Sequence, residues 1–355
     1  MYLLRLVLFI LLGFAVARIA NAHDLEDTGW YRLAVTSLLA IGLYASTYGI
    51  DLKEARRHLR IIVSAVTVGV VLKAAIIGGG LALLFQDPFF LILGITVAQI
   101  DPLSVANLLK GSRMSARAKT ILASWASFDD PITVILSLYA PVLVAQLTGV
   151  DFGSLTGNPD AGASLVTYIR ELGLNFLLAG GVLVLWLVIR HYAKKTYAGL
   201  DLGLAIFACL VLATALTLSI LYFLMLGIAL VGLFLRPPKL AAFIDRAVVW
   251  ALRAAAVLLG LLLIGGVNVW AGIALGVAAY VAQIIVGSLL TRGLPKKDRW
   301  HISFAQQNGI TAIILALLFE PIHPGTVAIV APAIIVINGL HGVANKIIDR
   351  YSLTE

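Results

Sequence analysis

The sequence predicts an all-α polytopic membrane protein with about twelve transmembrane helices, and composition is the first observation behind this prediction. Of 355 residues, 61% are hydrophobic and 12% charged, whereas soluble domains are usually about 45–50% apolar and about 25% charged. Because so little charge cannot coat a water-facing surface, an ordinary soluble enzyme, a disordered chain and a nucleic-acid-binding domain are excluded. The second observation is the length of the apolar runs, since each membrane-spanning helix needs roughly 20 apolar residues.

Apolar runs broken by charge, Gly or Pro mark the predicted helices. They lie roughly at 4–21, 33–50, 61–85, 88–109, 118–147, 164–190, 199–218, 219–235, 241–266, 270–291, 301–319 and 326–345. The connections are short, and the longest contains the polar stretch GVDFGSLTGNPDAG, which is rich in turn residues. We therefore expect a single transmembrane domain over residues 1–355, with no soluble domain.

The loops between these runs alternate in charge. Basic loops such as KEARRHLR, KGSRMSARAK and TRGLPKKDR alternate with HDLEDTGW, QDP and EPIHPG, and the basic set holds most of the 26 Lys and Arg residues. The positive-inside rule then predicts that both termini face the cytoplasm from a cell membrane. The net charge of +8 is thus explained by topology, and no nucleic-acid partner is expected.

The first apolar run permits two interpretations. The stretch ANA after it resembles a signal-peptide cleavage site, but an uncleaved first helix is favoured because it begins the alternation of the loops. The single cysteine, Cys209, excludes a disulfide framework, and the six histidines show no metal-ligand spacing. No cofactor is therefore expected.

Four charged residues fall well inside apolar segments: Asp101, Asp129, Asp130 and Lys73. A charge at the centre of a membrane helix costs at least about 2.5–3.5 kcal/mol on insertion scales, so each is a functional candidate. The alternative is that these residues form structural ion pairs.

Asp101 is followed by Pro102 in the segment LILGITVAQIDPLSVANLL. Proline removes a helix hydrogen bond and disfavours helical backbone at the residue before it, which predicts an interrupted helix. The interruption frees backbone carbonyls beside a carboxylate, an arrangement that suits a dehydrated cation. The alternative is a simple proline kink with Asp101 facing water.

Asp129 and Asp130 precede Pro131 one segment later, in ILASWASFDDPITVILSLY. Neighbours on a helix point about 100° apart, so the two need not share a ligand. Two carboxylates in a low-dielectric site cannot both ionise cheaply, and we expect at least one to gain affinity for a proton. A carboxylate that holds either a proton or a small cation has the chemistry needed for exchange.

The segment at 301–319 contains a second predicted interruption, the polar patch formed by Gln306, Gln307, Asn308 and Gly309. ITVAQIDP, which begins at Ile95, and ISFAQQNG, which begins at Ile302, share the pattern I-x-x-A-Q. Because the two segments are predicted to cross the membrane in opposite directions, they indicate an inverted repeat whose discontinuous helices meet near the midplane.

These motifs resemble the monovalent cation/proton antiporter (CPA) superfamily, which includes the sodium/proton exchangers. The most specific likeness covers residues 94–135, where an Asp-Pro, a short basic loop and an Asp-Asp pair follow one another. YFLMLGIALVGLF and GLYASTYGIDLKEARRHLR also resemble family helices, so the likeness extends over essentially the whole chain.

The resemblance implies a fold with two crossed discontinuous helices and exchange of Na⁺, Li⁺ or K⁺ for protons by alternating access. It implies core helices at about 61–147 and 270–345, scaffold or dimerisation helices at about 1–50 and 164–266, and a homodimer in the lipid bilayer. The resemblance implies that Asp130, Asp129 and Asp101 bind the ion and the proton, with Asp130 and Asp101 as ligands of the transported cation. Asp101 would be the carboxylate of the crossing helix, and Asp129 occupies the position before Asp130 in the motif. Ser127 is a further supporting candidate.

The sequence departs from the family pattern at three positions. Gln283 stands where a Lys or Arg is often found, Asn308 stands where Arg often precedes Gly, and Ile100 stands where Thr often precedes the crossing Asp. The usual basic partner for Asp129 is therefore missing. Lys73 is the candidate substitute, and the alternative is that Lys73 extends to the membrane interface.

Two other functions remain open. An organic-anion carrier with cation co-transport would use a related fold, although the charges at the interruptions are acidic. An intramembrane aspartyl hydrolase would use Asp101 and Asp130 on separate helices, although the sequence contains no G-x-G-D motif.

Overall fold

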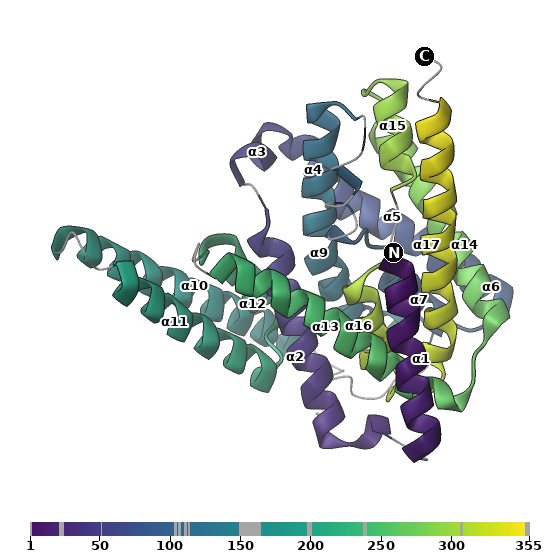
Figure 1. Ribbon diagram of the computed structural model, residues 1–355, viewed down its shortest axis with the longest axis horizontal. Coiled ribbons are helices and arrows are strands. Elements are labelled where there is room, and N and C mark those ends of the chain that lie inside the picture. The colour runs from purple at the N-terminus through teal and green to yellow at the C-terminus, as the bar shows by residue number, and fades with distance from the viewer. Residues whose placement is uncertain are drawn as a thin grey trace.

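In the part of the chain that it describes, the computed structural model consists mainly of helices joined by short connections (Figure 1). It describes all residues except 1, 21–24, 51, 103–104, 106–107, 110–111, 113, 149–164, 197–200, 237–239, 306–307 and 352–355. No strand occurs among the described residues, and the all-α class is confirmed.

The helices follow the predicted apolar segments closely. Their bounds are α1 (Tyr2–Ala20), α2 (Gly29–Tyr48), α3 (Leu52–Arg57), α4 (Leu59–Ser64), α5 (Val70–Ala74), α6 (Gly80–Phe85), α7 (Phe89–Thr96), α9 (Ala116–Thr148), α10 (Leu165–Thr196), α11 (Asp201–Tyr222), α12 (Met225–Phe234), α13 (Ala241–Leu262), α14 (Val269–Leu290), α15 (Lys296–Ser303), α16 (Ile310–Phe319) and α17 (Thr326–Tyr351).

Several described stretches are long and apolar enough to cross a membrane. They are 59–85, 169–191, 241–265, 269–290 and 326–348, and shorter apolar helices cover 206–222, 225–234 and 310–319. Large apolar side chains also cover the outer surface, with Leu177 of α10, Leu221 of α11 and Trp270 of α14 all more than 60% exposed. A surface of this kind suits lipid and not water, so the chain is a multi-pass membrane protein.

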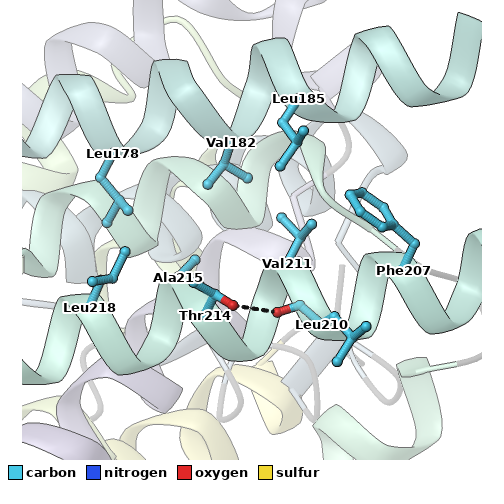
Figure 2. Close-up of a pocket in the computed structure, with 9 residues that line it drawn as sticks. All are labelled: Leu178, Val182, Leu185, Phe207, Leu210, Val211, Thr214, Ala215 and Leu218. Carbon is cyan, nitrogen blue, oxygen red and sulfur yellow. Dashed lines mark hydrogen bonds between the residues drawn. The ribbon is translucent and has the colours of Figure 1, made fainter.

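The long helices α10 and α11 extend together to the left in Figure 1, beside α12. Figure 2 shows Leu178, Val182 and Leu185 of α10 facing the side chains of α11 across an apolar pocket. Thr214, the hydroxyl residue in this lining, donates to the Leu210 carbonyl of its own helix at 2.9 Å. The two helices therefore meet through aliphatic packing.

Helix α2 connects helices that lie far apart in the sequence. The Tyr31 hydroxyl donates to the Leu317 carbonyl of α16 at 2.6 Å, and the Thr47 hydroxyl donates to the Ala229 carbonyl of α12 at 2.7 Å. These buried bonds connect the two ends of α2 to different helices, the N-terminal end to α16 and the C-terminal end to α12.

Besides the segment predicted at 88–109, in which α7 ends at Thr96, two predicted segments are subdivided in the structure. The segment predicted at 301–319 begins earlier, at Lys296, and is split into α15 and α16. The segment predicted at 61–85 contains two π-helical turns, Ala65–Gly69 and Ala75–Gly79, on either side of the short α-helix that carries Lys73. A π-helical turn inserts an extra residue and changes the direction of the following side chains, and such turns are frequent at functional sites.

Candidate functional site

The two interrupted helices contact each other at their interruptions. The first interruption follows α7, which ends at Thr96. Helical backbone resumes at Pro102, where the Val105 N–H donates to the Asp101 carbonyl at 3.0 Å. The second interruption separates α15 from α16. A Cβ atom added to Gly309 would collide with the side-chain carboxylate of Asp101. The predicted meeting of two discontinuous helices is therefore confirmed.

The contact leaves no room for a Cβ at position 309 unless the Asp101 carboxylate shifts. Gly309 directly precedes the first residue of α16, so the carboxylate lies beside a helix N-terminus. Such an N-terminus carries free N–H groups and a partial positive charge that favour an anion. Gln306 and Gln307, the other members of the predicted polar patch, lie outside the described residues.

Asp129 is held by partners from two other segments. Nζ of Lys73 donates to Oδ2 of Asp129 at 2.9 Å, and both side chains are fully buried. The backbone N–H of Ile100, which the first interruption frees, donates to the same oxygen at 2.9 Å. The Lys73 ammonium also lies 5.5 Å from the centre of the Trp125 ring. Lys73 therefore pairs with Asp129 and does not extend to the membrane interface.

Asp130 has a different environment although it is the next residue. Its side chain is 2% exposed, and its Oδ1 atom, like Oδ1 of Asp129, has no hydrogen-bond partner among the described residues. Thr311, in the first turn of α16, forms a side-chain hydrogen bond with Asp130, which also interacts electrostatically with Asp101. Asp101 is 2% exposed as well. The two carboxylates are thus buried close to the contact between the interruptions.

The three supporting candidates other than Lys73 lie in different places. The Ser127 hydroxyl donates to the Ala123 carbonyl at 2.9 Å on its own helix, so this bond does not link it to the aspartates. Nε2 of Gln283 donates to the Ile302 carbonyl at 3.2 Å, near the end of α15. Asn308 is buried within the second interruption, and its carbonyl accepts a bond from Asn338. Gln283 and Asn308 therefore belong to the surroundings of α15 and α16.

Sequence reasoning missed three polar neighbours of the site: Trp125, Thr311 and Asn338. Trp125 lies one helical turn before Asp129, a spacing that places both on one face of α9 and that the sequence does show. Thr311 is an ordinary residue within an apolar run, and nothing in the sequence distinguishes it. Asn338 is a polar residue inside the last apolar segment, which is a usable signal.

The fold, with its paired interruptions around buried carboxylates, is that of a polytopic membrane protein, and comparisons with known proteins identify its family. The family described as "Sodium/hydrogen exchanger, transmembrane" matches residues 2–337. The structure is similar to that of the sodium proton antiporter MjNhaP1 from Methanocaldococcus jannaschii, with a TM-score of 0.65 and 17% sequence identity. The match covers 96% of this chain and 92% of that chain.

Because the family match extends over nearly the whole chain, the chain belongs to the transmembrane sodium/hydrogen exchanger family. The resemblance seen in the Asp-Pro and Asp-Asp-Pro motifs is thereby confirmed. The likeness to the antiporter structure independently supports the polytopic antiporter fold.

Proposed function

We propose that the chain exchanges a monovalent cation for protons, and that the two compete for Asp130. Na⁺ and Li⁺ are the favoured cations, and K⁺ is a further candidate. The observation that carries this proposal is the buried Asp130 carboxylate, which lies near Asp101 and, unlike Asp129, forms no ion pair with a cationic side chain among the described residues. A bound proton or a bound cation would each relieve the repulsion between two buried carboxylates.

In the proposed cycle, Asp130 gives up its proton when a cation enters from one side of the membrane. The Asp130 and Asp101 carboxylates are the oxygen ligands that a hard monovalent cation needs, and the interrupted backbone adds polar groups at the same depth. After the site becomes accessible from the other side, a proton replaces the cation at Asp130. Competition for one site then couples the two fluxes.

Asp129 has a supporting role in this proposal. Its charge is balanced by Lys73, and its Oδ2 atom holds the backbone of the first interruption through Ile100. The pair therefore fixes α5, α9 and the first interruption relative to each other. Asp129 would keep its charge balanced while Asp130 alternates between proton and cation.

The proposal is tested with purified protein in proteoliposomes that carry an imposed pH gradient. We expect Na⁺ or Li⁺ to collapse the gradient with the unaltered protein, and we expect Asp130→Asn to abolish this effect because an amide cannot exchange a proton. Asp27→Asn, at the end of a short helical turn and exposed, is the matched control and should retain exchange. Cation-driven proton movement by Asp130→Asn at the unaltered rate would reject the mechanism.

The same measurement with Na⁺, Li⁺ and K⁺ in turn identifies the transported cation. Repeating it with and without a clamped membrane voltage shows whether each exchange cycle moves net charge. An organic-anion carrier remains the alternative function. Uptake of an organic anion without any cation-driven proton movement would favour that alternative over exchange.

A further inference from the structure

The last helix, α17, presents three polar side chains along one side. Asn338, His341 and Asn345 are spaced by three and four residues, which places them on the same face of a helix. Asn338 is 5% exposed and His341 is 4% exposed. Buried polar groups inside a membrane segment are costly and need partners, so their contacts indicate what they are for.

Asn338 and His341 bind the two ends of the second interruption. Nδ2 of Asn338 donates to the Asn308 carbonyl at 3.2 Å, and Nδ1 of His341 lies 2.8 Å from the Phe304 carbonyl. Both carbonyls belong to the stretch between α15 and α16. In a membrane interior, carbonyls that an interrupted helix leaves free must be satisfied by nearby protein groups.

The contacts of His341 also fix its tautomer. Because the Phe304 carbonyl can only accept, Nδ1 of His341 must carry the proton. Nε2 then accepts from Nδ2 of Asn345, which lies 2.6 Å away. The ring is thus held at both nitrogens, in an orientation that keeps Nδ1–H directed at the interruption.

We propose that Asn338 and His341 are positioning residues that hold the second interruption in the geometry needed for cation binding at Asp130 and Asp101. The inference rests on the proposed function. Neither side chain needs to touch the cation, because each would act through the backbone of the interruption. Asn308, whose carbonyl Asn338 binds, is adjacent to Gly309, and Gly309 contacts Asp101. Thr311, one residue into α16, reaches Asp130. Any displacement of the interruption would therefore move groups that border both carboxylates.

The test measures the cation concentration that gives half-maximal exchange for Asn338→Leu and His341→Leu. Because each variant loses one hydrogen bond to the interruption, we expect the apparent KM for the cation to rise roughly three- to tenfold in each variant. We expect the maximal rate to change less than KM. His341→Gln keeps an N–H donor for the Phe304 carbonyl and should restore a KM close to that of the unaltered protein.

His323→Gln is the matched control, because His323 lies in the short connection between α16 and α17 and is about one-third exposed. The thermal stability of each variant is measured with and without the cation, so that loss of fold is separated from loss of affinity. If the leucine variants do not fold, Asn338→Ser and His341→Gln provide the comparison, with Ser expected to raise KM and Gln expected to preserve it.

An unchanged KM in folded Asn338→Leu and His341→Leu protein would overturn the inference, as would a His341→Gln variant as impaired as His341→Leu. Asp130→Asn is measured in parallel to separate the two proposals. Exchange by Asp130→Asn rejects the proposed function itself. Loss of exchange in Asp130→Asn combined with an unchanged KM in the α17 variants rejects only the positioning role.

Discussion

Asp129 and Asp130 are neighbours on α9, yet they have different partners. Successive side chains on a helix point in directions about 100° apart, so Asp129 reaches Lys73 and the Ile100 N–H whereas Asp130 reaches Thr311 of α16. The Asp129 carboxylate holds three segments together through its Oδ2 atom, while its Oδ1 atom, like Oδ1 of Asp130, has no hydrogen-bond partner among the described residues. Asp130 differs because its charged neighbour is Asp101 and not a cation, so that a bound proton or a bound cation would relieve the repulsion at Asp130.

The ion pair of Lys73 and Asp129 leads to a prediction about stability. Lys73→Met removes one partner of a fully buried pair and leaves a buried carboxylate uncompensated, which typically costs about 3–5 kcal/mol. We expect a matching loss in the free energy of unfolding, together with an altered pH dependence or charge stoichiometry of exchange. Denaturant unfolding in detergent and proteoliposome transport measure the two effects.

Two further variants make the test of the pair specific. The double variant Lys73→Met/Asp129→Asn removes both charges and should regain part of the lost stability. Lys296→Met, at an exposed position at the start of α15, should change stability little. Equal stability of Lys73→Met and the unaltered protein, with unchanged transport, would show that the pair has no role.

At the scale of elements, the positions of the two helix interruptions could be predicted from residue chemistry. The π-helical turns and the exact start of α15 could not. Asp101-Pro102 and Asn308-Gly309 both mark positions where a helix is weak, and both lie at interruptions in the structure. The π-helical turns around Lys73 were not predictable, because apolar spacing does not specify the register of backbone hydrogen bonds. The start of α15 was missed because KKDRWH is polar and has the composition of a loop.

The close contact between the two interruptions predicts that adding a methyl group at Gly309 lowers stability and exchange activity. Gly309→Ala places a Cβ against the Asp101 carboxylate, and such overpacking costs about 1–3 kcal/mol in a packed interior. We expect lower stability and a large loss of exchange activity. Thermal unfolding and transport assays measure both.

Gly180→Ala on α10 is the matched control, since a Cβ there meets no atom within 4 Å. Alanine stabilises a helix interior by about 0.5–1 kcal/mol relative to glycine, so this variant should be as stable as the unaltered protein or slightly more stable. Full activity and stability in Gly309→Ala would contradict the close packing of the interruptions.

At the scale of the whole molecule, alternating access requires the predicted core at 61–147 and 270–345 to move relative to the predicted scaffold at 1–50 and 164–266. This division stays a prediction, as do the cytoplasmic termini and the homodimer. Two contacts bear on such a movement: the Tyr31–Leu317 bond joins the predicted scaffold to the predicted core, whereas the Thr47–Ala229 bond lies within the predicted scaffold. An elevator-like motion would have to break the first bond and could leave the second intact.

The central claim is that a proton and a cation compete for one carboxylate, and proton release on cation binding tests it most directly. The purified protein in weakly buffered detergent solution is titrated with Na⁺ or Li⁺ while the pH is recorded. The account predicts release of about one proton per cation bound, and no release from Asp130→Asn, because competition at a single site displaces one proton. Cation binding without proton release in the unaltered protein, across the pH range in which it transports, would contradict the account.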